Sequence, residues 1–428
     1  MKKTIYNVLA VAAVAAMALS CSTAGDYFDK MMDGGGTYDR EAFMDGGGDA
    51  AEPSAPGEGE EPGQNGNTNA GMLTAGEWND LDNWQFWGKL MLSQGDNDVV
   101  DIEDGEYYEG DGSFYKYCPY WNFYTNNRVA VKVTNSGAPA AGVKVVLNVD
   151  GKAVWTSVTD NLGEANCWIN LYKKESLAEE AKVSITIGGA EQPEAPVITR
   201  WSSDTTTYNL YEVSKSITAK KADIAFFVDA TGSMGDEIDF LQSDMIDIFK
   251  KVEKLQGGTE IRTAALFYRD EGDDYVTKVK DFTTDIKSVS DYVGKQSAAG
   301  GGDYPEAVHT ALEKGLQNLS WNEGARSRIV FMLLDAPAHH NDAVIESLHK
   351  SIENYAKMGI KIIPVAASGV DKATEFMLRF FAISTGGTYV FLTNDSGIGG
   401  DHIQASVGEY KVEQLNDLIV RLIDKYLE

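Results

Sequence analysis

Residues 222–235 have the sequence Ala-Asp-Ile-Ala-Phe-Phe-Val-Asp-Ala-Thr-Gly-Ser-Met-Gly. The apolar run at 224–228 is short and unbroken, which is typical of a strand that is buried on both faces of a parallel sheet. Asp229, Thr231 and Ser233 follow it directly, and a helical pattern begins after them. The stretch therefore predicts a strand-to-helix turn at the carboxyl edge of an α/β sheet, where such sheets bind their ligands.

One carboxylate and two hydroxyls make a hard oxygen cluster of low charge. Mg²⁺ prefers such oxygens, in octahedral geometry at roughly 2.0–2.1 Å, and keeps part of its water. In a structural interpretation, Asp229 and Ser233 only cap the following helix. The Asp-x-Thr-x-Ser pattern resembles the metal-ion-dependent adhesion site of von Willebrand factor A domains. This resemblance implies that Asp229, Thr231 and Ser233 bind Mg²⁺, or Ca²⁺ or Mn²⁺ in its place.

Strand and helix patterns alternate throughout residues 220–428. The alternation predicts an α/β fold with a doubly wound, mostly parallel sheet that has helices on both faces. The order is similar to that of von Willebrand A domains, which are Rossmann-like. The expected strands lie at 224–228, 261–268, 276–282, 329–334, 360–366 and 388–392. The expected helices lie at 234–255, 285–298, 304–319, 343–358, 372–384 and 411–427.

Two further loops supply acidic residues to the same sheet edge. Asp335 follows the strand at 329–334, and Gly-Gly-Gly-Asp-Tyr-Pro-Glu occupies 300–306. With Tyr-Arg-Asp at 268–270, these motifs resemble the A domains found beside alpha-kinases and in related bacterial proteins. The resemblance implies that Asp303 and Asp335 ligate the ion or hold its waters.

The identity of Asp303 has a chemical consequence. Integrin-like A domains offer a threonine in the corresponding loop, so a third carboxylate here would strengthen metal capture and weaken the pull on an acidic group of a partner. A competing interpretation is structural, because Asp303 and Glu306 have the spacing of a capping box for the next helix.

The N-terminal residues predict export. Lys2 and Lys3 precede an apolar run at 8–19 that is too short for a comfortable transmembrane helix, so residues 1–20 are expected to be a signal peptide. Small residues before Cys21 resemble the lipobox of bacterial lipoproteins, which implies cleavage before Cys21 and lipid on its thiol; ordinary signal cleavage is the alternative. The implied location is the cell envelope, as an outer-membrane lipoprotein that is surface-exposed or periplasmic.

Residues 21–75 are rich in glycine and acidic side chains, and we expect them to form a disordered tether. The formal net charge of the whole chain is −28 at pH 7, which argues against nucleic acid and anionic lipid headgroups as direct partners. The acidic run at 96–111 lacks EF-hand spacing and is expected to be a solvated loop.

Short alternating strands at 128–134, 143–149, 153–158, 165–171 and 182–187 predict a β-sandwich within residues 76–215. The domain resembles immunoglobulin-like or carboxypeptidase-regulatory-like sandwiches, and its clustered aromatic residues are expected in the core. Cys118 and Cys167 form one disulfide in an oxidising compartment or remain buried free thiols; the sequence leaves both open.

The sequence contains no His-Glu-x-x-His motif, no phosphate loop with a lysine and no nucleophile elbow, so we expect no enzyme. The predicted function is adhesion or protein binding through a divalent cation, with an acidic side chain of the partner completing the metal shell. A second hypothesis is a scaffold module of an envelope complex, in which the metal only stabilises the loops.

Overall fold

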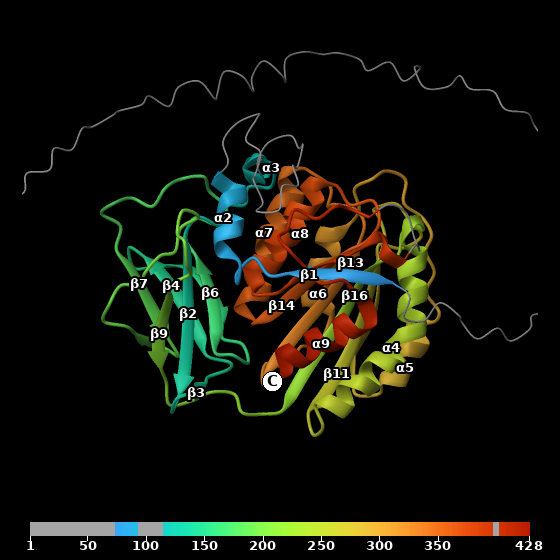
Figure 1. Ribbon diagram of the computed structural model, residues 1–428, viewed down its shortest axis with the longest axis horizontal. Coiled ribbons are helices and arrows are strands. Elements are labelled where there is room, and N and C mark those ends of the chain that lie inside the picture. The colour runs from blue at the N-terminus through green and yellow to red at the C-terminus, as the bar shows by residue number, and fades with distance from the viewer. Residues whose placement is uncertain (1–72, 93–113, 397–401) are drawn as a thin grey trace, which may run out of the picture. The chain divides into compact units, whose positions relative to one another are not determined.

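The computed structural model describes residues 73–92, 114–396 and 402–428. These residues form a large mixed sheet covered by helices, together with two smaller antiparallel-rich sheets formed upstream in the chain (Figure 1). The expected signal peptide, Cys21, nearly all of the expected tether and the acidic run at 96–111 lie outside the described residues. Within the described ranges, no helix has the length and apolar character needed to span a bilayer.

The central sheet has eight strands in the order β12-β11-β10-β13-β14-β15-β1-β16. Its third strand, β10, pairs in parallel with a neighbour on each side. This arrangement confirms the predicted mostly parallel sheet. The strands from the C-terminal half are β10 (Lys221–Asp229), β11 (Glu260–Tyr268), β12 (Thr277–Thr283), β13 (Ser327–Leu334), β14 (Ile360–Ala366), β15 (Tyr389–Leu392) and β16 (Glu413–Gln414).

Helices cover both faces of this sheet. One face packs against α4 (Gly235–Leu255), α5 (Ile286–Val293) and α9 (Leu415–Leu427). The other face packs against α6 (Val308–Asn318), α7 (Asp342–Lys357) and α8 (Lys372–Thr385). Phe226 of β10 belongs to the first core and Phe227 to the second, because successive strand side chains point to opposite faces. The doubly wound architecture is therefore confirmed.

Two helices begin later than the sequence pattern indicates. The helix expected from 304 begins at Val308, and its N-cap residue Ala307 provides no side-chain hydrogen bond. The expected capping box of Asp303 and Glu306 is therefore not formed. Pro305 disfavours helical backbone at Tyr304, and a β-bridge between Glu306 and Ala338 keeps residue 306 out of the helix. The last helix begins at Leu415 rather than 411, because β16 precedes it.

The N-terminal strand β1 (Thr74–Trp78) corrects the expected domain boundaries. From the sequence, the tether is expected to end at residue 75 and the sandwich to begin at residue 76. Instead, β1 lies in the central sheet, antiparallel to β15, with Ala75 opposite Leu392 and Trp78 opposite Tyr389. It also pairs with β16, and the Leu415 amide donates to the Leu73 carbonyl oxygen. Pairing on both sides satisfies its backbone groups and gives this short segment a fixed place.

Two four-stranded sheets form the predicted β-rich domain, and its main strands lie close to the expected ranges. Both sheets contribute side chains to a shared core, including Val131, Leu147 and Ile185. One sheet contains β2 (Arg128–Asn135), β3 (Ala138–Pro139), β6 (Glu164–Trp168) and β9 (Tyr208–Glu212). The other contains β4 (Lys144–Val149), β5 (Lys152–Val158), β7 (Val183–Ile187) and β8 (Ala190–Glu191).

Aromatic side chains join α2 (Trp84–Leu92) and the segment that follows α3 (Tyr117–Trp121) to helix α8. Trp87 stacks on Phe376 of α8 with ring centroids 6.0 Å apart, and Phe123 stacks on Phe380 at 3.5 Å. These rings are buried, so they belong to the core, as expected.

Cys118 and Cys167 are buried free thiols, so the disulfide that the sequence left open is not formed. Cys118 lies on α3, where its Sγ is 3.8 Å from Met91 Sδ. Cys167 lies in β6, and its Sγ is 3.3 Å from Ser157 Oγ. The two thiols have different neighbours, which explains why they do not pair.

Candidate metal centre at the carboxyl edge of the central sheet

Asp229 ends β10 and is completely buried. The backbone N–H and the hydroxyl of Thr231 both donate to Asp229 Oδ1, at 2.9 and 2.7 Å. Asp229 Oδ2 has no hydrogen-bond partner among the described residues. The turn thus fixes one carboxylate oxygen and leaves the other available to a ligand.

Asp335 follows β13, the strand next to β10 in the sheet. Because the two strands are parallel, Asp335 and Asp229 reach the same edge. Burial raises the pKa of Asp335, and the nearby Ser233 side chain reduces that shift, while Asp335 Oδ1 has no partner within the described ranges. The structure therefore brings together four predicted ligands, namely Asp229, Thr231, Ser233 and Asp335.

The loop at 299–306 contributes a different acid from the one expected. Asp303 is exposed and makes no hydrogen bond or ion pair within the described residues. Glu306 is 3% exposed, and its Oε2 has no hydrogen-bond partner in that part of the chain. The Glu306 amide donates to the Pro337 carbonyl oxygen at 2.8 Å, which holds this residue beside the loop that follows Asp335.

From the sequence, Glu306 is expected only as half of a capping box. Pro305 directly before it was the available signal, since that proline makes a continuous helix from residue 304 unfavourable. A glutamate in a non-helical loop is free to turn its side chain toward the sheet edge.

Glycine lets the loop pass close to the turn after β10. The Gly232 amide donates to the Gly300 carbonyl oxygen at 3.2 Å. Gly301 has a φ of +76°, and a Cβ atom there would lie 3.0 Å from Glu306 Oε1 and 3.3 Å from Thr231 Cβ. A side chain at this position would be strained and would crowd the space between Glu306 and Thr231.

Burial raises the pKa values of the acids at this edge. Burial raises the pKa of Asp229 to about 7, and the nearby charge of Asp335 adds to the shift. Burial likewise raises the pKa of Glu306 to about 9, with contributions from the charges of Asp229, Asp270 and Asp335. Glu237, in the first turn of α4, has a pKa raised to about 7, chiefly by burial. Such shifts mark a concentration of negative charge that a bound cation would relieve.

The nearest basic groups do not neutralise this cluster. Arg269 donates to the carbonyl oxygens of Ala230 and Ser297, at 3.0 and 2.8 Å, and so fastens the loops together. His339 Nε2 lies 2.6 Å from Asp270 Oδ1. Asp270 therefore has a partner, whereas Asp229, Glu306 and Asp335 retain unpaired oxygens.

The donors suit a hard divalent cation. Within the described residues, no three His, Cys, Asp or Glu side chains are arranged to hold a metal by themselves. Mg²⁺ commonly uses only one or two carboxylates and completes its shell with other oxygens and water. The unpaired oxygens of Asp229 and Asp335, with the hydroxyls of Thr231 and Ser233, form such a set, and Glu306 lies close enough to add its charge.

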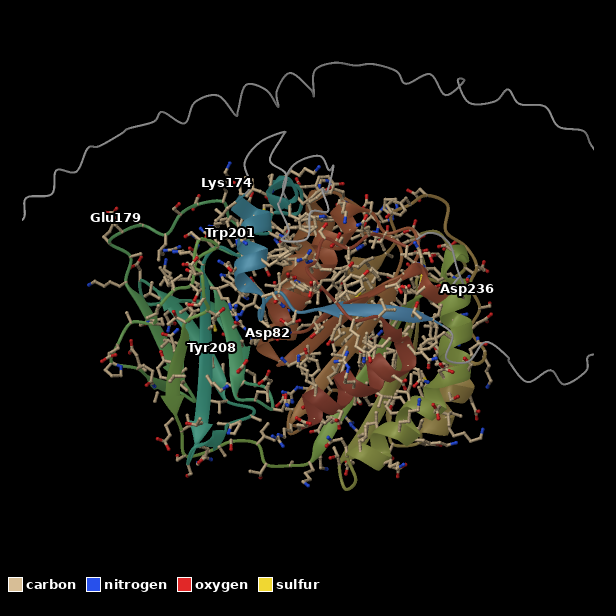
Figure 2. All side chains as sticks on the ribbon, viewed as in Figure 1. Asp82, Lys174, Glu179, Trp201, Tyr208 and Asp236 are labelled. Carbon is tan, nitrogen blue, oxygen red and sulfur yellow. The ribbon has the colours of Figure 1, made fainter. Side chains whose placement is uncertain are left out.

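In Figure 2, Asp236 at the start of α4 lies on one side of the view, while Lys174 and Glu179 of the β-rich domain lie on the other.

Comparisons with known proteins bear on the fold family. A family profile described as von Willebrand factor A domain matches residues 223–378. A stretch of 130 residues is 30% identical to an ariadne-like RING finger protein of Acanthamoeba polyphaga mimivirus. The match covers 30% of this chain and spans only 12% of the length of that protein.

Two solved structures show weaker similarity. The crystal structure of BatB, a conserved hypothetical protein from Bacteroides thetaiotaomicron, is 15% identical with a TM-score of 0.33, covering 48% of this chain and 98% of that one. Proximal thread matrix protein 1 of the mussel byssus is 16% identical with a TM-score of 0.28, covering 39% of each chain. At these TM-scores, neither structure supports a conclusion about this chain. The profile match, which spans both Asp229 and Asp335, together with the doubly wound sheet, identifies residues 223–378 as part of a von Willebrand factor A domain.

Proposed function

We propose that the carboxyl edge of the central sheet binds a hard divalent cation, Mg²⁺, Ca²⁺ or Mn²⁺, and that a protein partner docks at the same edge. The observation that carries the proposal is the set of unpaired buried oxygens on Asp229, Glu306 and Asp335. Buried charges without a counterpart are unfavourable, and a cation at this edge would provide that counterpart.

Each residue has a role in this proposal. Asp229 and Asp335 bind the ion, together with the hydroxyls of Thr231 and Ser233. Glu306 ligates it or holds its waters, the role that the sequence assigned to Asp303. Asp303 is exposed at the loop surface and contributes little beyond long-range charge.

The proposed activity is binding rather than catalysis. The A domain suggests a role in protein interaction or adhesion. When bound, the ion would supply a coordination position for an oxygen of the partner, and an acidic side chain is the expected donor. The charge of Glu306 weakens that attraction, so we expect the surrounding protein surface to provide much of the affinity.

The charge of Glu306 also favours a second candidate, in which the protein is a scaffold module and the metal only stabilises the loops. Capture of envelope proteins by the tagged full chain, with Mg²⁺ and with EDTA, separates the two functions. Adhesion predicts that EDTA and Asp229→Asn both abolish capture while the circular dichroism spectrum is unchanged. Capture that is indifferent to both would instead support scaffolding.

We further propose that the protein is anchored in the cell envelope through lipid on Cys21. The support is the sequence alone, namely the basic start, the apolar run at 8–19 and the small residues before Cys21. Cells expressing the wild type are expected to incorporate labelled palmitate into the protein, whereas cells expressing Cys21→Ala are not. Labelling that survives this substitution would contradict the assignment.

A further inference from the structure

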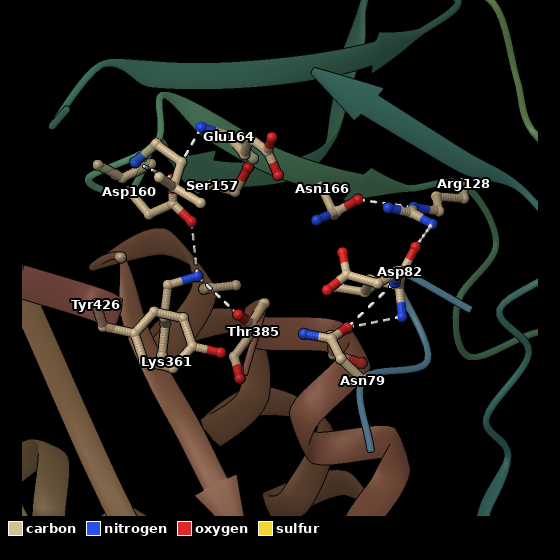
Figure 3. Close-up of a pocket in the computed structure, with 18 of the residues that line it drawn as sticks. Asn79, Asp82, Arg128, Ser157, Asp160, Glu164, Asn166, Lys361, Thr385 and Tyr426 are labelled. Carbon is tan, nitrogen blue, oxygen red and sulfur yellow. Dashed lines mark hydrogen bonds and ion pairs between the residues drawn. The ribbon is translucent and has the colours of Figure 1, made fainter. Parts of the chain in front are cut away.

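A cavity of about 70 Å³ lies where the β-rich domain meets the A domain (Figure 3). Arg128, Asn166 and Asp82 line one side of it, and the ion pair of Lys361 and Asp160 lies on the other. Asp82 is exposed, so the cavity reaches the protein surface at this end. The cavity is separate from the acidic edge, which is the edge of the central sheet that holds Asp229, Glu306 and Asp335.

Arg128 is a completely buried cation that has no ion pair among the described residues, although its Cζ lies 4.8 Å from the Trp84 ring centroid. Its Nε donates to Asn166 Oδ1 at 2.7 Å, and its Nη1 donates to the Leu81 carbonyl oxygen and Thr206 Oγ1 at 3.0 and 3.1 Å. All three acceptors are neutral, and Nη2 has no hydrogen-bond partner in the described part of the chain. A buried guanidinium normally pairs with a carboxylate or phosphate, so this one lacks its usual counterpart.

The other polar groups of the cavity show which group is missing. Lys361 Nζ is already satisfied by Asp160 Oδ2 at 2.9 Å and by the Gly386 carbonyl oxygen at 2.6 Å. Ser384 of α8 is 2% exposed, and its hydroxyl has no partner within the described residues. Arg128 and Ser384 therefore leave two hydrogen-bond donors for an anion to accept.

Asp82 restricts the kind of anion. Its carboxylate makes no recorded hydrogen bond or ion pair among the described residues, and its charge is felt by Arg128. A dianion such as phosphate would be repelled by Asp82, whereas a molecule that carries both a carboxylate and an ammonium group would satisfy Arg128 and Asp82 together. The small volume favours the smallest such molecules.

We propose that this cavity binds a small zwitterionic α-amino acid, with its carboxylate on Arg128 and its ammonium group facing Asp82. The ligand bridges the two domains, because Arg128 belongs to β2 of the β-rich domain and Ser384 to α8 of the A domain. It is independent of the cation at the acidic edge.

Calorimetric titration of the full chain with glycine, alanine, acetate and inorganic phosphate tests this site. We expect glycine or alanine to bind at least tenfold more tightly than acetate, and phosphate not to bind. Asp82→Asn is expected to remove the preference for the amino acid over acetate, and Ser384→Ala to weaken both. Asp204→Asn, which changes an exposed acid outside the cavity, serves as the matched control and is expected to bind like wild type.

Three results would overturn the proposal. The first is the absence of amino-acid binding to wild-type protein. The second is equal binding of glycine and phosphate. The third is a large loss of stability in Asp82→Asn without ligand, which would mean that Asp82 itself pairs with Arg128. Both test variants avoid Arg128, whose replacement could prevent folding.

Discussion

Two groups of buried charge in this protein are built in opposite ways. Asp80 and Glu375 surround Arg379, and all three side chains are essentially inaccessible to solvent. Arg379 donates to both carboxylate oxygens of Asp80, at 2.9 and 2.5 Å, and to Glu375 Oε1 at 3.2 Å. Lys372 and the Ser406 amide satisfy the remaining positions on Glu375. At the acidic edge, by contrast, Asp229, Glu306 and Asp335 each have an oxygen without a hydrogen-bond partner among the described residues.

The difference separates a structural cluster from a binding cluster. Burial alone would lower the pKa of Arg379, but the charge and hydrogen bonds of Asp80 outweigh it and the pKa is raised. The carboxyl groups at the acidic edge have no such compensation, so burial raises their pKa values. Buried groups without partners are concentrated at functional sites, which is why we propose a ligand for this cluster and one for Arg128.

The largest expected effect comes from breaking the compensated cluster. Asp80→Ala leaves Arg379 buried without its main partner, which should cost about 3–5 kcal/mol of unfolding free energy. Chemical denaturation monitored by circular dichroism measures this loss, and Mg²⁺ should not restore it. Asp204→Asn is the exposed control. A cost below about 0.5 kcal/mol, as for an ordinary surface position, would show that the two clusters do not differ as described.

Asp229→Asn changes one of the unpaired acids at the acidic edge, and unlike Asp80→Ala it should not lower the stability of the fold. Removing one buried negative charge should leave the melting temperature in EDTA unchanged or raised. Wild-type protein should be stabilised by Mg²⁺ at 100 times its dissociation constant, by about 2.7 kcal/mol, and the variant should lose this gain. Thermal melts of both proteins in EDTA and in Mg²⁺ make the comparison. Equal stabilisation of both proteins by Mg²⁺ would argue against Asp229 as a ligand.

The pH dependence of the metal-free protein provides a third comparison. The folded-state pKa of Glu306 is raised to about 9, above the unfolded value of about 4.3. The folded state therefore binds this proton more tightly, so its contribution to stability is complete below about pH 4 and is lost as pH rises toward 9.

Melting temperatures in EDTA should accordingly fall between pH 5 and pH 8, and they should fall less in Glu306→Gln. The variant is the necessary control, because the net charge of −28 also destabilises the fold at higher pH. Parallel curves for wild type and variant would exclude Glu306 as a source of the effect.

The smallest effect is expected from Asp303. Its side chain is exposed, so Asp303→Asn should change Mg²⁺ affinity by no more than about twofold through screened charge. Glu306→Gln should weaken affinity by roughly 10–100-fold, as for groups that hold metal ligands in place. Calorimetric titrations rank the two variants. If the order is reversed, the loop moves on metal binding and Asp303 is the acid that reaches the ion.

Local patterns were sufficient to predict most strands of the central sheet and most residues of the candidate metal centre. The apolar run before Asp229 and the strand before Asp335 have lengths and boundaries that can be read directly, and parallel pairing brings their ends together. The choice between Asp303 and Glu306 depends on where helix α6 begins, and a shift of four residues exchanges their roles.

Long-range pairing could not be predicted in the same way. Strand β1 has the sequence Thr-Ala-Gly-Glu-Trp, which lacks a clear apolar alternation, and its partner β15 lies more than 300 residues later. The Asp80–Arg379 pair spans a similar distance, at 299 residues. Both depend on the completed sheet rather than on local preference.

Mg²⁺ titration by calorimetry at pH 7.5, repeated in two buffers of different ionisation enthalpy, tests the central claim most directly. Metal binding must displace protons from acids whose pKa values are raised by unpaired burial. We expect one Mg²⁺ to bind per chain with net release of protons, and Glu306→Gln to release fewer. Absence of binding, or binding whose proton release is the same in wild type and variant, would contradict the account.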